Sequence, residues 1–168
     1  MSGTTRSESD KQGEQEPTTV FLLAQVGAQA GIRWGERLLE YGLTPAQVGI
    51  LFMLAKSEGV NQRFLADQLG VVPSRLVVLA DELEGAGLIE RGANAPDRRT
   101  HAINLTDAGR AMLISIGDVL REHDEAFLAA LSEEEQFQLR GFLEKIAEQE
   151  ELSPGVHPGY RLLSPRKK

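Results

Sequence analysis

The sequence has no cysteine, a single tryptophan and only 5% aromatic residues. The absence of cysteine excludes disulfides, thiolate nucleophiles, cysteine-ligated zinc and thiol oxidation sensing. No run of about twenty apolar residues occurs, and residues 1–16 are polar apart from Met1, so we expect neither a membrane span nor a secretory signal. These absences predict a cytoplasmic protein that uses no thiol chemistry and does not bind a membrane.

Patterns that support catalysis or metal binding are also missing. The sequence offers no phosphate-binding loop, no nucleophile–base pair and no metal-ligand spacing. The three histidines, His101, His123 and His157, are far apart in the sequence. We therefore expect no enzyme activity, no metal site and no cofactor.

The formal net charge is −7, which taken alone argues against nucleic-acid binding, because phosphate contacts usually need a basic surface. The acidity is concentrated in residues 111–152, which carry −8, whereas residues 61–110 carry only −1. The middle of the chain can therefore present arginines to DNA while the acidic segment lies away from the phosphates.

The composition divides the chain into three parts. Residues 1–16 are polar and rich in charge and predict a disordered tail. Residues 17–151 hold the apolar periodicity and are long enough for one domain with a sizeable core. Residues 152–168 contain three prolines and carry net positive charge, which predicts a basic C-terminal tail.

A helix is expected from Pro17, with apolar residues on more than one face, so it should pack on two sides. Within it Gly27, Gly31 and Gly35 recur every four residues, each at a cost of about 1 kcal/mol relative to alanine. Either a neighbouring helix approaches closely there, or the missing side chains open a ligand cavity. Of the two, we favour close packing.

The next segments predict a helix-turn-helix. Residues 44–47, Thr-Pro-Ala-Gln, form a capping box that begins a second helix. A short helix over Gln62–Leu69 stops at Gly70, and Pro73 begins another helix that stops at Gly85. Two helices joined by a tight turn that contains glycine are typical of this motif.

A β-hairpin and two helices are expected to follow. Residues 88–91 and 100–105 alternate in polarity on either side of a polar stretch, which predicts two strands with a long charged tip. Thr106 caps a long helix to about Leu131, and Ser132 begins a last helix to about Gln149. The predicted fold class is mainly α with a small β-hairpin.

Several segments, in this order and at these spacings, resemble the MarR (multiple antibiotic resistance regulator) family of transcriptional regulators. They are Leu43-Thr44-Pro45-Ala46-Gln47, Leu65-Ala66-Asp67-Gln68-Leu69-Gly70-Val71, Asp81-Glu82-Leu83-Glu84, Gly87-Leu88-Ile89-Glu90-Arg91, Asp97-Arg98-Arg99 and Leu105-Thr106-Asp107-Ala108-Gly109-Arg110. The resemblance implies a winged helix-turn-helix with a DNA-binding lobe over residues 43–105 and dimerisation helices over residues 17–42 and 106–151. It further implies a homodimer on a pseudo-palindromic DNA site, with repression as the commoner mode.

In this family the N-terminal residues of the recognition helix read the major groove, which implies that role for Pro73, Ser74 and Arg75. Arg75 suits a bidentate contact to guanine. The chain departs from the family at Val72, where a capping Ser, Asp or Thr is common, and at Val77 and Val78, where polar residues are frequent. Base reading is therefore expected to rest chiefly on Ser74 and Arg75.

The resemblance also implies a wing that uses Asp97, Arg98 and Arg99. Asp97 would orient the guanidinium of Arg99 for insertion into the minor groove, and Arg98 would contact the backbone. Candidate phosphate contacts elsewhere are Gln62 and Arg63. Arg91 and Arg110 fit either phosphate contacts or structural ion pairs, and both interpretations stay open.

Regulation by a small aromatic or anionic ligand is a further implication of the resemblance. Trp34, Phe52 and Arg33 are the candidate pocket residues, although core packing is favoured for the two aromatic side chains. The alternative function is a winged-helix module that binds a protein partner, which the acidic net charge and the apolar recognition helix favour. The wing sequence over residues 97–99 argues instead for DNA.

Overall fold

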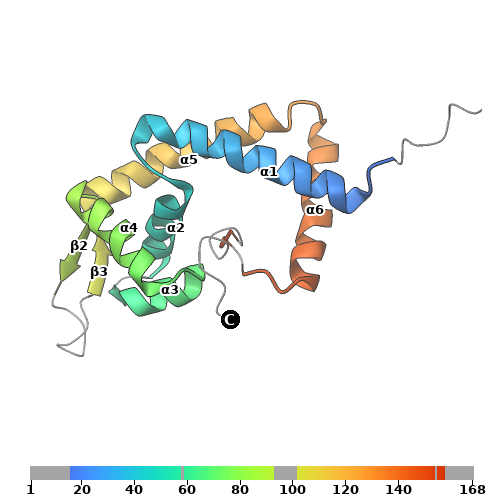
Figure 1. Cartoon of the computed structure of the whole chain (residues 1–168). Helices are drawn as coiled ribbons and strands as arrows, with labels where there is room; N and C mark the ends of the chain where they lie inside the picture. The colour runs from blue at the N-terminus through green and yellow to red at the C-terminus, as the bar shows by residue number, and fades with distance from the viewer. Residues whose placement is uncertain (1–15, 58, 93–101, 154, 158–168) are drawn as a thin grey trace, which may run out of the picture.

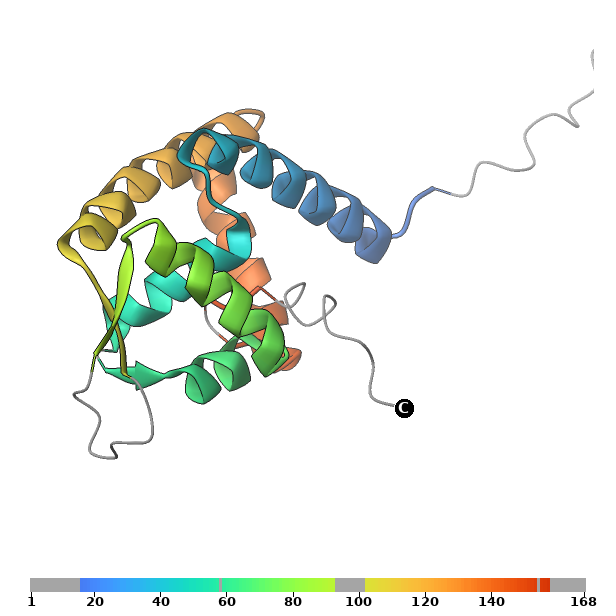
Figure 2. The same cartoon turned by 60° about the vertical axis from the view of Figure 1, so that its left-hand side comes forward.

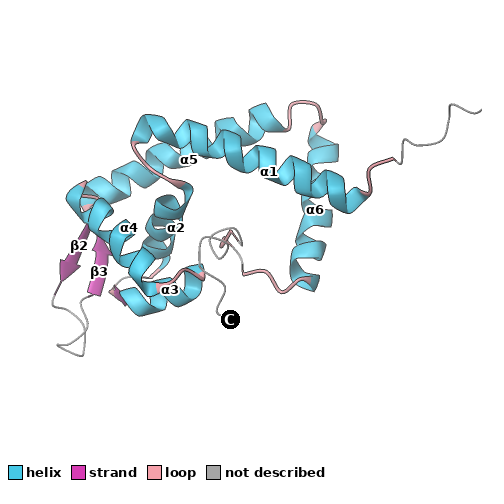
Figure 3. Ribbon diagram, viewed as in Figure 1, coloured by secondary structure: helices cyan, strands magenta, loops and turns pink. Residues whose placement is uncertain are grey.

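The computed structural model describes residues 16–57, 59–92, 102–153 and 155–157 and consists of helices around a small antiparallel sheet (Figures 1 and 3). The elements are α1 (Thr19–Leu38), a 3₁₀ turn (Leu39–Tyr41), α2 (Pro45–Lys56), β1 (Val60–Asn61), α3 (Gln62–Leu69), α4 (Pro73–Gly85), β2 (Ile89–Gly92), β3 (Ala102–Leu105), α5 (Asp107–Phe127) and α6 (Glu133–Gln149). The mainly α fold with a small β element is confirmed.

Local capping explains where most helices begin. The capping box at Thr44 is present, with the Thr44 amide donating to Oε1 of Gln47 at 2.8 Å. A second capping box, between Ser132 and Glu135, begins α6 at the predicted residue. Thr106 begins α5 by accepting a hydrogen bond from the Gly109 amide at 3.0 Å, while its hydroxyl donates to the Gly87 carbonyl. These side chains satisfy amide groups that have no partner within the helix.

The sheet has three strands rather than the two predicted. Strand order is β1-β3-β2, and β1 pairs with β3 through Val60 opposite Ile103 and Asn61 opposite Ala102. β1 has only two residues and runs directly into α3, so it is too short to show alternating polarity in the sequence. The hairpin of β2 and β3 is confirmed, with pairing from Ile89–Leu105 to Gly92–Ala102.

The long helix α5 ends at Phe127, before the predicted end near Leu131. Leu128 leaves the helical conformation, and a turn follows in which the Leu131 amide donates to the Leu128 carbonyl at 2.9 Å. The Gln136 side chain on α6 donates to the carbonyls of Leu128 and Leu131. This amide stabilises the early ending because it supplies partners to carbonyls that helix continuation would otherwise satisfy.

The hydrophobic core lies in the lobe made by α2, α3, α4 and the sheet. Residues from the C-terminal end of α1 and from the N-terminal half of α5 complete it. Its largest fully buried side chains are Leu38, Ile50, Leu51, Leu54, Leu65, Leu69, Leu76, Leu79, Leu83, Ile89, Ile103 and Ile116. Ile116 on α5 and Leu38 on α1 anchor the two long helices to this core. Figures 1 and 2 show the chain turning sharply at the far end of α5, and in Figure 1 α6 runs across the direction of α5.

The helix α1 does not pack on two sides within the chain, contrary to expectation. Of its residues only Leu38 is buried, and Val20, Phe21 and Ile32 are more than half exposed. A Cβ at Gly27, Gly31 or Gly35 would meet no atom within 4 Å, so the favoured close packing of this stripe is not found among the described residues. The sequence pattern predicts an apolar surface, and the described residues leave most of it exposed.

Among the described residues no single helix is long and apolar enough to cross a membrane. The helices α1 and α2 pass that test only as a pair, and the chain bends by 77° between them.

The start of α5 depends on a glycine. A Cβ at Gly109 would overlap the backbone carbonyl oxygen of Leu88, whereas a Cβ at Gly117 in the same helix would meet nothing within 4 Å. We expect Gly109→Ala to lower the free energy of unfolding by about 1–3 kcal/mol through overpacking. Gly117→Ala is the control and should not destabilise, since alanine favours helix. Urea denaturation measures both, and a Gly109→Ala protein as stable as wild type would contradict the close approach.

Candidate nucleic-acid interface

The helices α3 and α4 form the predicted helix-turn-helix. Gly70 ends α3 in the left-handed region, with φ of 66°, which glycine adopts without strain. The Val71 amide then donates to the Ala66 carbonyl at 3.0 Å, and α4 begins at Pro73. No side chain caps α4 at Val72, as the sequence predicted. The turn between the two helices is therefore short and closed by backbone hydrogen bonds.

The two faces of α4 differ sharply. Leu76, Leu79, Ala80 and Leu83 are at most 1% exposed and face the core. The predicted base-reading residues Pro73, Ser74 and Arg75 are all exposed, and they lie together in the first turn. The core side of the helix thus fixes which side chains point outward.

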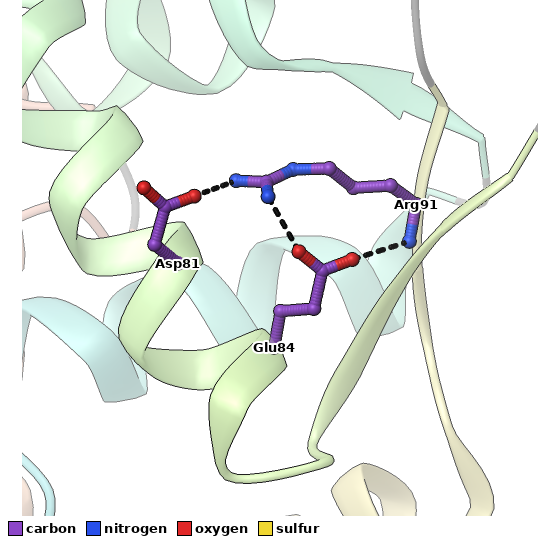
Figure 4. A network of polar contacts seen from close by, with 3 residues as sticks. All are labelled: Asp81, Glu84 and Arg91. Carbon is purple, nitrogen blue, oxygen red and sulfur yellow. Dashed lines mark hydrogen bonds and ion pairs between the residues drawn. The ribbon is translucent and has the colours of Figure 1, made fainter.

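A network of three charged side chains ties α4 to the sheet (Figure 4). Arg91 on β2 donates from one guanidinium nitrogen to Asp81 and from another to Glu84, each at 2.5 Å. Its backbone amide also donates to Glu84 at 3.3 Å. The Arg91 side chain is only 23% exposed. Arg91 is therefore a structural ion-pair partner, which decides between the two interpretations that the sequence left open.

A second contact holds α4 against α2. Gln47 is buried, and its Nε2 donates to Oε2 of Glu82 at 2.8 Å while its Oε1 accepts from the Thr44 amide. The sequence identified Gln47 only as part of a capping box. Its bond to Glu82 spans 35 positions, and no local pattern signals a contact at that separation.

The remaining predicted DNA contacts fall into two groups. Asp97, Arg98 and Arg99 lie outside the described residues, and residues 93–101 join the last paired residues of β2 and β3. Gln62 is half-buried and Arg63 exposed, and both lie in the first turn of α3.

A cluster of rings joins α1 to α5. The ring centroids of Trp34 and His123 are 5.7 Å apart, and those of His123 and Phe127 are 5.8 Å apart. The Arg33 guanidinium lies 5.6 Å from the centroid of Phe127, within range of a cation–π interaction. The structure thus brings two of the predicted ligand residues, Arg33 and Trp34, to one cluster.

Phe52, the third predicted ligand residue, lies on α2 and is half-buried against the core, as Trp34 is. None of the three borders the large groove between α1, α5 and α6, which has a volume of about 1120 Å³. Apolar side chains dominate that groove, among them Leu23, Ala30, Phe137 and Leu143. No group of three or more metal-ligating side chains occurs in the described part of the chain.

His123 in the ring cluster is buried. Burial lowers the pKa of its imidazole below the ordinary 6.5, and the nearby charge of Arg37 lowers it further. Asp124 opposes this with a smaller effect, and Arg33 adds the smallest effect, which again lowers the pKa.

The ion pairs of Arg91 should stabilise the fold measurably. We expect Arg91→Met to lower the free energy of unfolding by about 1 kcal/mol, because the partly buried pairs are lost. Arg91→Lys should recover only part of this, since an ammonium lacks the two-pronged geometry. The matched control is Arg121→Met, which removes an exposed pair with Asp118 and should change stability by less than about 0.5 kcal/mol. Equal effects in urea denaturation would contradict the structural role.

The depressed pKa of His123 predicts a dependence of stability on pH. Well above pH 6.5 the imidazole is neutral in both states, and as the pH falls through 6.5 the unfolded chain takes up the proton first. The free energy of unfolding should therefore decrease from about pH 7.5 to about pH 5.5, and by less in His123→Phe. Identical pH profiles for the two proteins would contradict the assignment.

Comparison with known proteins identifies the fold family. The sequence model of the MarR family matches residues 41–100. An HTH-type transcriptional repressor of Mycobacterium tuberculosis, Rv2887, is 32% identical over 126 residues, which cover 75% of this chain and 91% of the repressor.

Two solved structures of the MarR family protein Rv2887 extend this match. Its complex with DNA is 29% identical with a TM-score of 0.67, covering 78% of this chain and 98% of that chain. Its complex with salicylic acid is 30% identical with a TM-score of 0.64, and the match covers 79% of this chain and 98% of that chain. These relatives favour the DNA-binding interpretation over the protein-binding alternative. The chain therefore belongs to the MarR family of DNA-binding transcriptional regulators.

Proposed function

We propose that two copies of this chain bind a pseudo-palindromic DNA site in the cytoplasm and repress transcription from it. The observation that carries the proposal is the geometry of α4, whose first turn is exposed while its opposite face is fully buried. The Arg91 and Gln47 contacts hold the helix from two sides. A recognition helix needs this rigidity because base contacts depend on its position in the groove.

The major-groove contacts are assigned to Pro73, Ser74 and Arg75. These residues begin α4, and N-terminal residues of recognition helices contact base edges. The Arg75 guanidinium supplies two donors to the O6 and N7 acceptors of guanine. The arginine is exposed and belongs to no ion pair among the described contacts, so it is available for such a contact.

The wing supplies the minor-groove contact in this proposal. β2 and β3 remain paired as far as Gly92 and Ala102, so the segment with Asp97 and Arg99 leaves from adjacent strand ends. Arg99 enters the minor groove with Asp97 orienting it, and Arg98 contacts the backbone. Gln62 and Arg63 contact phosphates from the first turn of α3, where backbone amides also favour anions.

The second copy covers the apolar surface of the long helices. Phe21 on α1 and Phe137 and Phe142 on α6 are more than half exposed in the single chain. Leu23, Phe137 and Leu143 line one groove between these helices, and contiguous apolar surface of this kind marks a protein–protein interface. Residues 17–42 and 106–151 are therefore assigned to dimerisation, and residues 43–105 to the DNA-binding lobe.

A small aromatic anion is the proposed inducer, bound at the ring cluster with Arg33 and Trp34, and with Phe52 on the core side. The relative solved with salicylic acid supports this ligand class. Such a ligand shifts DNA affinity only if it prefers one arrangement of the two lobes. Because Trp34 is the only tryptophan, salicylate should change its fluorescence. Arg33→Met should weaken salicylate binding about tenfold through loss of a charge-assisted contact. No fluorescence change in wild type would contradict the site.

Selection of bound duplexes from a randomised pool tests the DNA assignments. Wild type should recover a two-fold site whose half-site centres lie about one helical turn apart. Arg75→Ala should relax the preference for one guanine by about 1–3 kcal/mol, and Arg99→Ala should remove the preference for A·T-rich flanks.

Glu16→Ala, an exposed change before α1 and outside both the lobe and the dimerisation segments, is the control and should leave the recovered sequence unchanged. Failure of the wild-type protein to enrich any sequence would contradict the proposal.

A further inference from the structure

Two valines are exposed on the outward side of α4. Val77 is 39% exposed and Val78 is 45% exposed. Neither is needed for the core, because the buried face of α4 is already complete. β-branched residues also have a lower helix propensity than most alternatives. Exposed valines at this place therefore suggest a surface that becomes buried when the protein binds its target.

Val78 lies in the middle of the outward face of α4. With 3.6 residues per turn, residues three and four apart share a stripe, so Val78 lies in line with Ser74 and Asp81. This stripe is opposite the buried one formed by Leu76, Leu79, Ala80 and Leu83. Val77 lies about 100° round the helix, at the flank of the exposed face. Val78 is thus the apolar side chain that faces outward most directly.

The neighbours of Val78 set its chemistry. Asp81, at one end of the stripe, is held by Arg91 at 2.5 Å, so its carboxylate is directed to the sheet. Ser74, at the other end, is polar and lies in the first turn. Between them Val78 offers an isopropyl group with no polar atom.

We propose that Val78 contacts the C5-methyl group of a thymine in the major groove and so reads that base. This inference rests on the proposed DNA binding. All four bases carry hydrogen-bonding groups on their major-groove edges, and thymine alone adds a C5-methyl group, beside its O4 acceptor. An isopropyl group gains free energy by covering that methyl group, and at the other bases it meets a polar edge with no methyl group to cover. Val78 therefore favours thymine and disfavours the other bases at that position.

The spacing of α4 also places this thymine. Arg75 and Val78 are three residues apart, which is about 4.5 Å along the helix axis. One base-pair step is about 3.4 Å. The thymine read by Val78 thus lies within two base pairs of the guanine read by Arg75.

Deoxyuridine, which lacks only the C5-methyl group, provides the test. In the selected duplex, each thymine near the guanine of Arg75 is replaced in turn by deoxyuridine. One replacement should weaken wild-type binding about fourfold in each half-site, the effect of one buried methyl group. Val78→Ala should bind the thymine duplex several-fold more weakly and show no further loss with deoxyuridine. This variant should fold, since the side chain is exposed and alanine favours helix.

The matched control is Val77→Ala, the same change at the flank of the helix, which should keep the fourfold deoxyuridine effect. An equal deoxyuridine effect in wild type and Val78→Ala, or none at any position in wild type, overturns the inference while specific DNA binding stands. Loss of the effect in Val77→Ala instead of Val78→Ala also overturns it. If wild type selects no sequence at all, the proposed function itself fails.

Discussion

The burial of one face of α4 is the constraint on which DNA recognition in this protein depends. Leu76, Leu79 and Leu83 are almost completely removed from solvent. Rotating the helix would expose these large apolar side chains, which would cost several kilocalories per mole of folding free energy. This packing fixes the rotation of α4 about its axis. A hydrogen bond from Gln47 to Glu82 and two ion pairs with Arg91 then hold it against α2 and β2. The buried side chains of α4 therefore determine which of its side chains point toward the DNA.

The long helix α5 connects the DNA-binding lobe to the ring cluster on α1. Its first turn packs against the backbone of Leu88 at Gly109, beside the sheet that carries the wing. Ile116 enters the core of the lobe, and His123 joins the ring cluster with α1. A ligand that alters the α1–α5 contact can therefore shift the lobe without unfolding it, provided that it prefers one lobe arrangement.

Local patterns in the sequence predicted the elements that local interactions determine. Thr44, Thr106 and Ser132 begin their helices as capping residues, and Gly70 ends α3 as expected. Features that depend on distant contacts were missed or left open. The two-residue strand β1 exists because it pairs with β3, and the role of Arg91 depends on two carboxylates of α4. The expected packing of α1 on two sides is not found among the described residues, because it depends on contacts that no local pattern specifies. The roles of Asp97, Arg98 and Arg99 stay predictions.

In the proposed function a dimer presents two copies of α4 at a fixed separation to the two halves of one DNA site. The most direct measurement is the affinity for the selected duplex after about five base pairs, half a helical turn, are inserted between the half-sites. The insertion moves one half-site to the opposite side of the duplex. Affinity should then fall to that for a duplex with one half-site. Unchanged affinity would show that each chain binds its half-site independently and would contradict a fixed separation of the two helices.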